Sequence, residues 1–171
     1  MTRPRTVLRL TLPPALSVLL LAAAGTLSPA SAETYWTFRN DYEGTCLTAS
    51  TTTGNVWGAA CNDSLATRQW HWGNETYTDL QGKKYKRLVS RANGNCLTTD
   101  QKTLTNTVWT SRCGSGEQFW KADADVDKIE NADGYDLRSS SNGDALYTSP
   151  YRVVDLYDIE PERFTWWGAH S

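Results

Sequence analysis

The side chains that most often carry catalysis are scarce in this chain of 171 residues. Two histidines are present: His71 lies between two tryptophans in a strand-like segment, and His170 is next to the last residue. General acid–base catalysis needs a titrating group that a partner holds in position, and neither histidine belongs to such a pattern or to a metal-ligand pair. No serine lies in a nucleophile-elbow motif. The sequence therefore predicts a protein that is not an enzyme and needs no cofactor.

One acidic stretch, residues 123–134, carries aspartate at its first, third and fifth places, as a calcium loop does. An EF-hand loop also needs glycine at its sixth place and glutamate at its twelfth. Those places hold Lys128 and Gly134. We therefore expect a polar connector here and no metal site.

The first 32 residues have the order of a secretory signal. Three arginines come first, an uncharged apolar run follows from about residue 10 to residue 27, and Ala30 and Ala32 form a small-residue cleavage site. The alternative, a membrane anchor, is disfavoured by two prolines that interrupt the run. We expect cleavage after Ala32 and a secreted mature domain, residues 33–171, without a membrane span.

The charge of this mature domain argues against nucleic-acid binding. The signal segment holds three of the 17 basic residues and none of the 19 acidic ones, which leaves 14 against 19 and a net charge of −5. Nucleic-acid binding needs a positive surface that displaces counterions from phosphates. The single basic cluster, KKYKR at 83–87, is typical of a solvated hairpin. We expect no nucleic-acid partner.

Three similar phrases recur with a period of about fifty residues, which indicates a repeat architecture. They are GTCLTAS (44–50), GNCLTTD (94–100) and GDALYTS (143–149). Each is followed by a second phrase (NVWGAAC, NTVWTSRC, YRVVDLY) and a third (RQWHW, EQFWK, ERFTW). Strand-forming residues alternate with clusters of Gly, Asn, Asp and Ser, and no helical period is sustained. The sequence therefore predicts an all-β domain of three lobes around a pseudo-threefold axis.

All four cysteines lie in the predicted mature domain, and an even count in an exported chain suggests two disulfides. Four cysteines allow three pairings. If each lobe closes its own loop, the pairs are Cys46 with Cys61 and Cys96 with Cys113. The matching places of the third lobe hold Ala145 and Tyr157, a methyl group and a ring.

The repeated phrases resemble the ricin-type β-trefoil, the domain of the R-type lectins, over essentially the whole mature chain. QFW at 118–120 matches the family's Gln-x-Trp motif literally, and RQWHW and ERFTW match it more loosely. In that family the repeated tryptophans are structural. The resemblance therefore implies a central cluster of one aromatic residue per lobe: Trp70, Phe119 or Trp120, and Phe164.

The family binds sugars through three other positions in each lobe: an Asp after the first cysteine, an aromatic ring before the second, and an Asn before the final tryptophan. The carboxylate makes strong, directional hydrogen bonds to hydroxyls, and the ring stacks on the sugar. Here the Asp places hold Thr48, Thr98 and Tyr147; the ring places hold Ala59, Ser111 and Asp155; the Asn places hold Thr67, Gly116 and Pro161. No lobe keeps the family's arrangement, so ordinary galactose recognition is not expected.

In the third lobe the two chemical roles are exchanged, since Tyr147 takes the Asp place and Asp155 the ring place. One hypothesis is a remodelled ligand site in which Tyr147 stacks, Asp155 accepts hydrogen bonds, and Tyr151 lies on the loop between them. The alternative is that Tyr147 and Tyr157 fill the space that the absent disulfide leaves.

We therefore expect a secreted, non-catalytic, lectin-like module whose sugar site is altered, with glycans or a glycosylated surface as its partner. The alternative is a protein-binding trefoil, such as a hydrolase inhibitor or the cell-docking subunit of a toxin. The fold alone does not choose between them, because function depends on the site that a fold carries.

Overall fold

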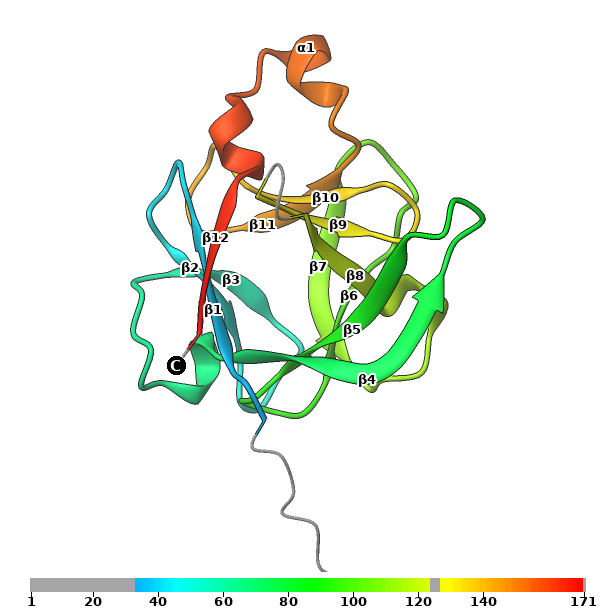
Figure 1. Cartoon of the computed structure of the whole chain (residues 1–171). Coiled ribbons are helices and arrows are strands. Elements are labelled where there is room, and N and C mark those ends of the chain that lie inside the picture. The colour runs from blue at the N-terminus through cyan, green and yellow to red at the C-terminus, as the bar shows by residue number, and fades with distance from the viewer. Residues whose placement is uncertain (1–32, 124–126, 171) are drawn as a thin grey trace, which may run out of the picture. The chain divides into compact units, whose positions relative to one another are not determined.

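The computed structural model describes residues 33–123 and 127–170. The predicted signal segment and Asp125 lie outside these residues. The described part is nearly all β-structure (Figure 1). Its strands are β1 (Trp36–Asn40), β2 (Cys46–Ala49), β3 (Val56–Ala59), β4 (Trp70–Thr78), β5 (Lys84–Ser90), β6 (Cys96–Thr99), β7 (Asn106–Ser111), β8 (Phe119–Asp123), β9 (Lys128–Asn131), β10 (Asp136–Ser139), β11 (Leu146–Ser149) and β12 (Trp166–His170).

Four short helical segments connect some of these strands. They are the 3₁₀ turns η1 (Ala66–Arg68), η2 (Gly116–Gln118) and η3 (Pro161–Phe164), and the helix α1 (Val153–Tyr157). No helix in the described ranges is long and apolar enough to cross a membrane.

The strands form a barrel and three hairpins. Antiparallel pairing links the barrel strands in the order β12–β1–β4–β5–β8–β9, and the hydrogen bond from Trp166 N to Asp127 O, 2.7 Å long, joins the two ends. The hairpins are β2–β3, β6–β7 and β10–β11. Each lobe thus has four strands, two of which form its hairpin. The lobes are β1–β4, β5–β8 and β9–β12. The predicted all-β fold with pseudo-threefold repeats is confirmed.

The backbone hydrogen bonds before each hairpin fix where each repeat begins. The N–H of Gly44 donates to the carbonyl of Asn40, that of Gly94 to Ser90, and that of Gly134 to Asn131. All three glycines have positive φ (67°, 71° and 79°), a conformation that glycine adopts without steric cost. The third repeat therefore begins at Gly134.

The predicted start of the third repeat, Gly143, is wrong. Residues 143–149 run into β11, which is the counterpart of β3 and β7 and not of β2 and β6. The first cross-strand pair shows the correct register, with Asp136 opposite Ser149 where the other lobes have Cys46 opposite Ala59 and Cys96 opposite Ser111. GDALYTS resembles GTCLTAS in sequence but has no cysteine, so the resemblance did not determine its position in the repeat. The pairing of the hairpin strands does determine the register.

The centre of the barrel holds one tryptophan from each lobe. The indole N–H of Trp70 donates to Leu47 O, that of Trp120 to Leu97 O, and that of Trp166 to Leu137 O, at 2.9, 2.8 and 2.9 Å. All three side chains are buried, and they belong to one hydrophobic cluster. The buried indole N–H groups are thus satisfied by backbone carbonyls, as aromatic residues with a polar atom require.

Two of the aromatic residues expected at this centre have other neighbours. Phe119 packs between the Arg87 guanidinium, 4.3 Å away, and the Tyr77 ring, 5.6 Å away. Phe164 is buried against the Tyr151 ring at 5.4 Å, and Trp166 takes the central place in its lobe. The Gln-x-Trp motif of the second lobe therefore places Trp120, and not Phe119, at the centre.

The two disulfides are confirmed, since Cys46 is bonded to Cys61 and Cys96 to Cys113. In each of the first two lobes, the first cysteine pairs across the hairpin with a residue of the next strand, and the second cysteine comes two positions after that residue. In the third lobe Asp136 pairs with Ser149, and the residue two positions later is Tyr151. The cysteine places of the third lobe are therefore Asp136 and Tyr151, not Ala145 and Tyr157.

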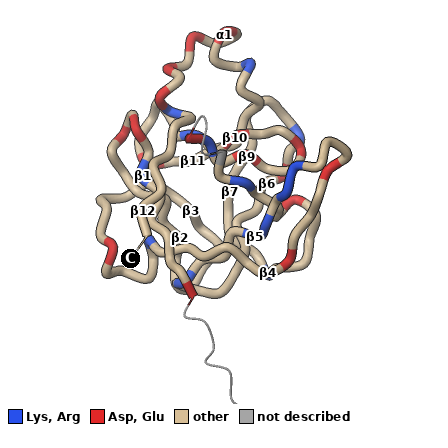
Figure 2. Tube along the Cα trace, viewed as in Figure 1, with Lys and Arg blue, Asp and Glu red and all other residues tan. Residues whose placement is uncertain are grey.

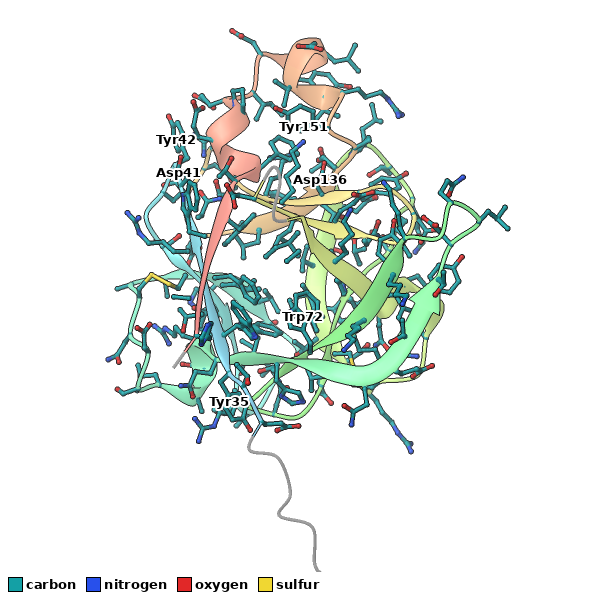
Figure 3. All side chains as sticks on the ribbon, viewed as in Figure 1. Tyr35, Asp41, Tyr42, Trp72, Asp136 and Tyr151 are labelled. Carbon is teal, nitrogen blue, oxygen red and sulfur yellow. A yellow bond between two sulfur atoms is a disulfide. The ribbon has the colours of Figure 1, made fainter. Side chains whose placement is uncertain are left out.

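A cation joins these two residues, both of which are labelled in Figure 3. Lys128 Nζ lies 3.9 Å from Asp136 Oδ2 and 2.9 Å from the centre of the Tyr151 ring. The third lobe thus has a largely buried ion pair and a cation–π contact where the other lobes have a disulfide. A desolvated cation–π contact contributes about 2 kcal/mol, and much of the gain from a buried ion pair is offset by the cost of desolvating its charges. The side chain of Tyr157 is 60% exposed, so it does not fill the vacant disulfide space.

A buried tyrosine makes the stability of the domain sensitive to alkaline pH. Burial raises the pKa of Tyr85 to about 12 from 10.0, and the negative charges of Glu130 and Asp79 contribute. Because the pKa is higher in the folded protein, the unfolded chain loses the Tyr85 proton at a lower pH than the folded protein does. The contribution of Tyr85 to stability is therefore complete below pH 10.0 and is lost as the pH rises towards 12. We expect a loss of about 2 kcal/mol in the free energy of unfolding over this interval.

Urea unfolding at several pH values between 9 and 12 measures this loss, with Tyr85→Phe as the matched variant. The variant keeps the ring but has no proton to lose, so its alkaline loss should be smaller by the same amount. An identical pH dependence in both proteins would contradict the prediction.

Candidate functional site

The Asp places of the family's sugar site are buried and internally hydrogen-bonded in this protein. With the corrected register, the Asp places are Thr48, Thr98 and Arg138, which are between 0% and 7% exposed. The two threonine hydroxyls donate to the carbonyls of Cys46 and Cys96 at 2.8 and 2.9 Å, and Arg138 Nε donates to Ser149 Oγ at 2.9 Å. A sugar hydroxyl has no access to these groups.

In the second lobe, a single glutamine closes the family's site. The amide Nε2 of Gln118 donates to Thr98 Oγ1 and to Ser111 Oγ, at 3.0 and 2.9 Å, and its Oε1 accepts from Arg87 Nη1 at 3.0 Å. Its side chain is fully buried. The network occupies the place where the Asp and ring positions converge, so it is a structural element rather than a binding site.

The three residues of the predicted ligand site have different surroundings. Tyr147 lies across the hairpin from Arg138, whose guanidinium is 5.4 Å from its ring, and opposite Thr107 of β7. Its counterparts in the other lobes are Trp57 and Trp109, which belong to the hairpin strands.

Tyr151 contacts Lys128 and Phe164, and Asp155 lies exposed on α1. α1 belongs to a connection, residues 150–160, that is longer in the third lobe than in the others and projects from the barrel in Figure 1. Tyr147 and Asp155 make no contact with each other among the described residues. Their joint role in ligand binding stays a prediction.

A cleft of about 330 Å³ is lined by residues of all three lobes. We call it the Tyr77 cleft, and the residues that carry the argument are Tyr77, Gln101, Glu117, Phe119 and Asp133. They come from β4, the β6–β7 loop, η2, β8 and the β9–β10 turn. Its volume is at the small end of ligand pockets and is sufficient for a monosaccharide.

One wall of the Tyr77 cleft is an exposed aromatic ring on a rigid support. A register shift in the β4–β5 pairing between Trp72 and Thr76 redirects the end of β4, and Tyr77 follows it. Tyr77 is 43% exposed, yet its ring packs on Phe119 at 5.6 Å and on Tyr85 at 6.1 Å. The ring therefore offers one face to solvent and is held by its other contacts.

Two further lining residues of the cleft, Glu117 and Asp133, carry hydrogen-bond acceptors. Glu117 lies in the first turn of η2, where hydrogen bonds from its own backbone N–H and from Ser115 hold the pKa of its carboxyl below the ordinary value. Asp133 is exposed in the turn between β9 and β10, and its N–H donates to Asn131 Oδ1 at 3.1 Å. Glu117 is therefore ionised at neutral pH, and both carboxylates face solvent.

Gln101, one of the lining residues, has an amide donor without a partner. Nε2 of Gln101 is buried and makes no hydrogen bond within the described residues. Gln101 also has a φ of +52°, which is uncommon for a residue other than glycine. A buried donor without a partner costs free energy, and such costs together with unusual backbone conformations concentrate at functional sites.

Comparison with known proteins gives the name of this fold. No protein-family model matches the chain, and no curated protein is similar to it in sequence. Among solved structures, the designed threefold-symmetric protein ThreeFoil is 21% identical, with a TM-score of 0.59 over 79% of this chain and 97% of its own. The BEL β-trefoil is 16% identical, with a TM-score of 0.58 over 82% of this chain and 95% of its own. This protein is a β-trefoil.

A third similar structure is a ricin B-like lectin from Macrolepiota procera, in complex with lactose. It is 15% identical to the trefoil described here, with a TM-score of 0.56 over 82% of this chain and 98% of its own. The expected β-trefoil fold is thus confirmed.

Sequence reasoning missed four residues of the Tyr77 cleft: Tyr77, Gln101, Glu117 and Asp133. One of them had a usable signal. The family's Asn place is counted back from the central tryptophan of each lobe, and counting from Trp120 instead of Phe119 leads to Glu117 instead of Gly116. The other three residues come from loops and strand ends that no repeated phrase of the trefoil contains.

Proposed function

We propose that this trefoil is exported and binds carbohydrate without catalysing a reaction, and that the Tyr77 cleft holds a sugar ring. The observation that carries this proposal is the meeting of an exposed ring, two carboxylates and an unpartnered amide donor in one cleft. Two disulfides support an oxidising compartment outside the cytoplasm. The lactose-bound lectin of the same fold supports a carbohydrate as the ligand.

Each group of the cleft matches one part of a sugar. The apolar face of a pyranose lies flat on an aromatic ring, which Tyr77 provides. Carboxylates accept strong hydrogen bonds from hydroxyls, a role for Glu117 and Asp133. The amide of Gln101 donates to a ring or hydroxyl oxygen and gains the partner that it lacks in the free protein.

A glycan array with the purified protein identifies the sugar, and calorimetric titration of the best glycan into single variants tests the cleft. We expect Tyr77→Ala to weaken binding about fivefold, because an aromatic contact is worth about 1 kcal/mol. We expect Glu117→Gln to weaken it about 10- to 100-fold, because hydrogen bonds to charged groups contribute about 1.5–3 kcal/mol.

The matched control is Tyr157→Ala, which removes a more exposed tyrosine ring from α1 and should leave binding unchanged. Asp155→Ala tests the site predicted from the sequence. If Asp155→Ala abolishes binding and Tyr77→Ala does not, the sugar lies on the α1 connection and not in the Tyr77 cleft. An array without any binding glycan would contradict the proposed function itself.

A protein-binding module is the second candidate, and one observation favours it. The α1 connection projects from the barrel and exposes Leu156 and Tyr157, each at 60%. Two large side chains on a protruding helix are typical of residues that anchor a protein interface. If one extracellular protein is captured, and if Leu156→Ser and Tyr157→Ala abolish its capture, this function replaces carbohydrate binding.

A further inference from the structure

The end of the barrel that lies away from the hairpins is hollow. Two adjoining hollows of about 570 and 220 Å³ share the side chains of Trp72 and Ala122. Their other lining residues come from the strand ends remote from the hairpins, such as the start of β1 and of β5. We call the two hollows together the barrel mouth; Figure 3 shows Trp72 within the ring of barrel strands.

The floor of the barrel mouth is aromatic. Trp36 and Phe38 are stacked with ring centres 6.4 Å apart, and Phe38 meets Trp72 edge to face at 6.1 Å. Phe38 is buried, whereas both tryptophans are half-buried and line the hollow. The mouth therefore presents apolar surface that no other described residue covers, which is the usual lining of a small-molecule site.

Two lysines of β5 stand over this floor. Side chains alternate across a strand, so Lys84 and Lys86 share the face of β5 that carries the core residue Leu88. Both line the larger hollow, and neither makes an ion pair among the described residues. Their neighbour on the strand, Arg87, is instead buried and paired with Glu75 at 2.8 Å. Figure 2 shows this run of basic residues on β5.

Charge and apolar surface together define the ligand class. Two ammonium groups beside apolar rings gain most from an anion, because the attraction between charges strengthens where water is displaced. The aromatic floor gains from an apolar body of the same molecule. A sugar has neither property, so the barrel mouth is chemically different from the Tyr77 cleft.

From this geometry we propose that the barrel mouth binds a small amphipathic anion, with its apolar body on Trp72 and its anionic head between Lys84 and Lys86. A medium-chain fatty acid has this pattern. The site does not depend on carbohydrate binding, so either proposal stands if the other fails.

Titration of decanoate into the purified protein, followed by calorimetry and by intrinsic tryptophan fluorescence, tests this proposal. We expect saturable binding with one decanoate per protein and about tenfold weaker binding of uncharged decanol. The double variant K84Q/K86Q should also weaken decanoate about tenfold and remove the preference over decanol. Because both lysines are exposed, the variant should fold, which its circular dichroism verifies.

The matched control is Lys83→Gln, which removes an adjacent charge that does not line the hollow. It should leave the decanoate affinity unchanged, whereas Trp72→Ala should weaken decanoate and decanol alike. Absence of saturable binding overturns the proposal, and so does equal affinity of the wild-type protein and K84Q/K86Q. Equal affinity for decanol and decanoate also overturns it, because the lysines would then have no role.

Discussion

Replacement of all four cysteines by serine is expected to lower the free energy of unfolding by about 6 kcal/mol. The bonds close loops with sequence separations of 15 and 17 residues, and loops of that size contribute about 3 kcal/mol each through the entropy of the unfolded chain. Domains of this kind are stable by about 5–15 kcal/mol in total. The variant should therefore be at the limit of folding at 25 °C.

Urea unfolding followed by tryptophan fluorescence measures the loss. The two single-loop variants, Cys46→Ser with Cys61→Ser and Cys96→Ser with Cys113→Ser, serve as controls, and each should lose about half. If the fourfold variant loses less than about 2 kcal/mol, the packing of the lobes rather than the cross-links holds the fold. Such a result would make the first two lobes similar to the third, which has an ion pair in place of a disulfide.

The second large effect is expected from Trp120→Ala. Trp120 is fully buried at the centre of the barrel, and truncation of a buried aromatic residue costs about 3–5 kcal/mol. The variant also leaves the carbonyl of Leu97 without the indole donor that it accepts from at 2.8 Å. We expect a corresponding decrease in the midpoint of urea unfolding.

Two further variants separate the causes. Trp120→Phe keeps an apolar ring but removes the donor, so it should cost about 1–3 kcal/mol. Trp167→Ala truncates a tryptophan that is 48% exposed and should cost much less. Equal losses in Trp120→Ala and Trp167→Ala would contradict a core that depends on one tryptophan per lobe.

The third lobe shows how far a repeated phrase can be trusted. In the first two lobes cysteine marks the start of the hairpin, and there the predicted register was correct. In the third lobe Asp136 stands in that place, and without cysteine the similar phrase at 143–149 was taken for the start. The backbone hydrogen bond from Gly134 to Asn131 decides the register. In the sequence, nothing distinguishes Gly134 from the other glycines of the chain.

The sugar positions show a related limit. Their loss could be predicted from residue types, because threonine and serine cannot replace a carboxylate and a ring. That Gln118 closes the second of these sites could not, because the closure depends on Thr98 and Ser111 lying within 3.0 Å of its amide. Such distances are set by packing and not by residue type.

The sequence by itself determined the all-β class, the threefold repetition and both disulfide pairs. These features are local: strand patterns, glycine turns and cysteine spacing each act within one lobe. The tertiary structure alone decided the third register, the place of Trp166 at the centre, the Tyr77 cleft and the barrel mouth. The register and the place of Trp166 depend on hairpin pairing and packing within the third lobe. The cleft and the barrel mouth depend on contacts between lobes, where side chains far apart in the chain meet because three hairpins and a barrel must share one core.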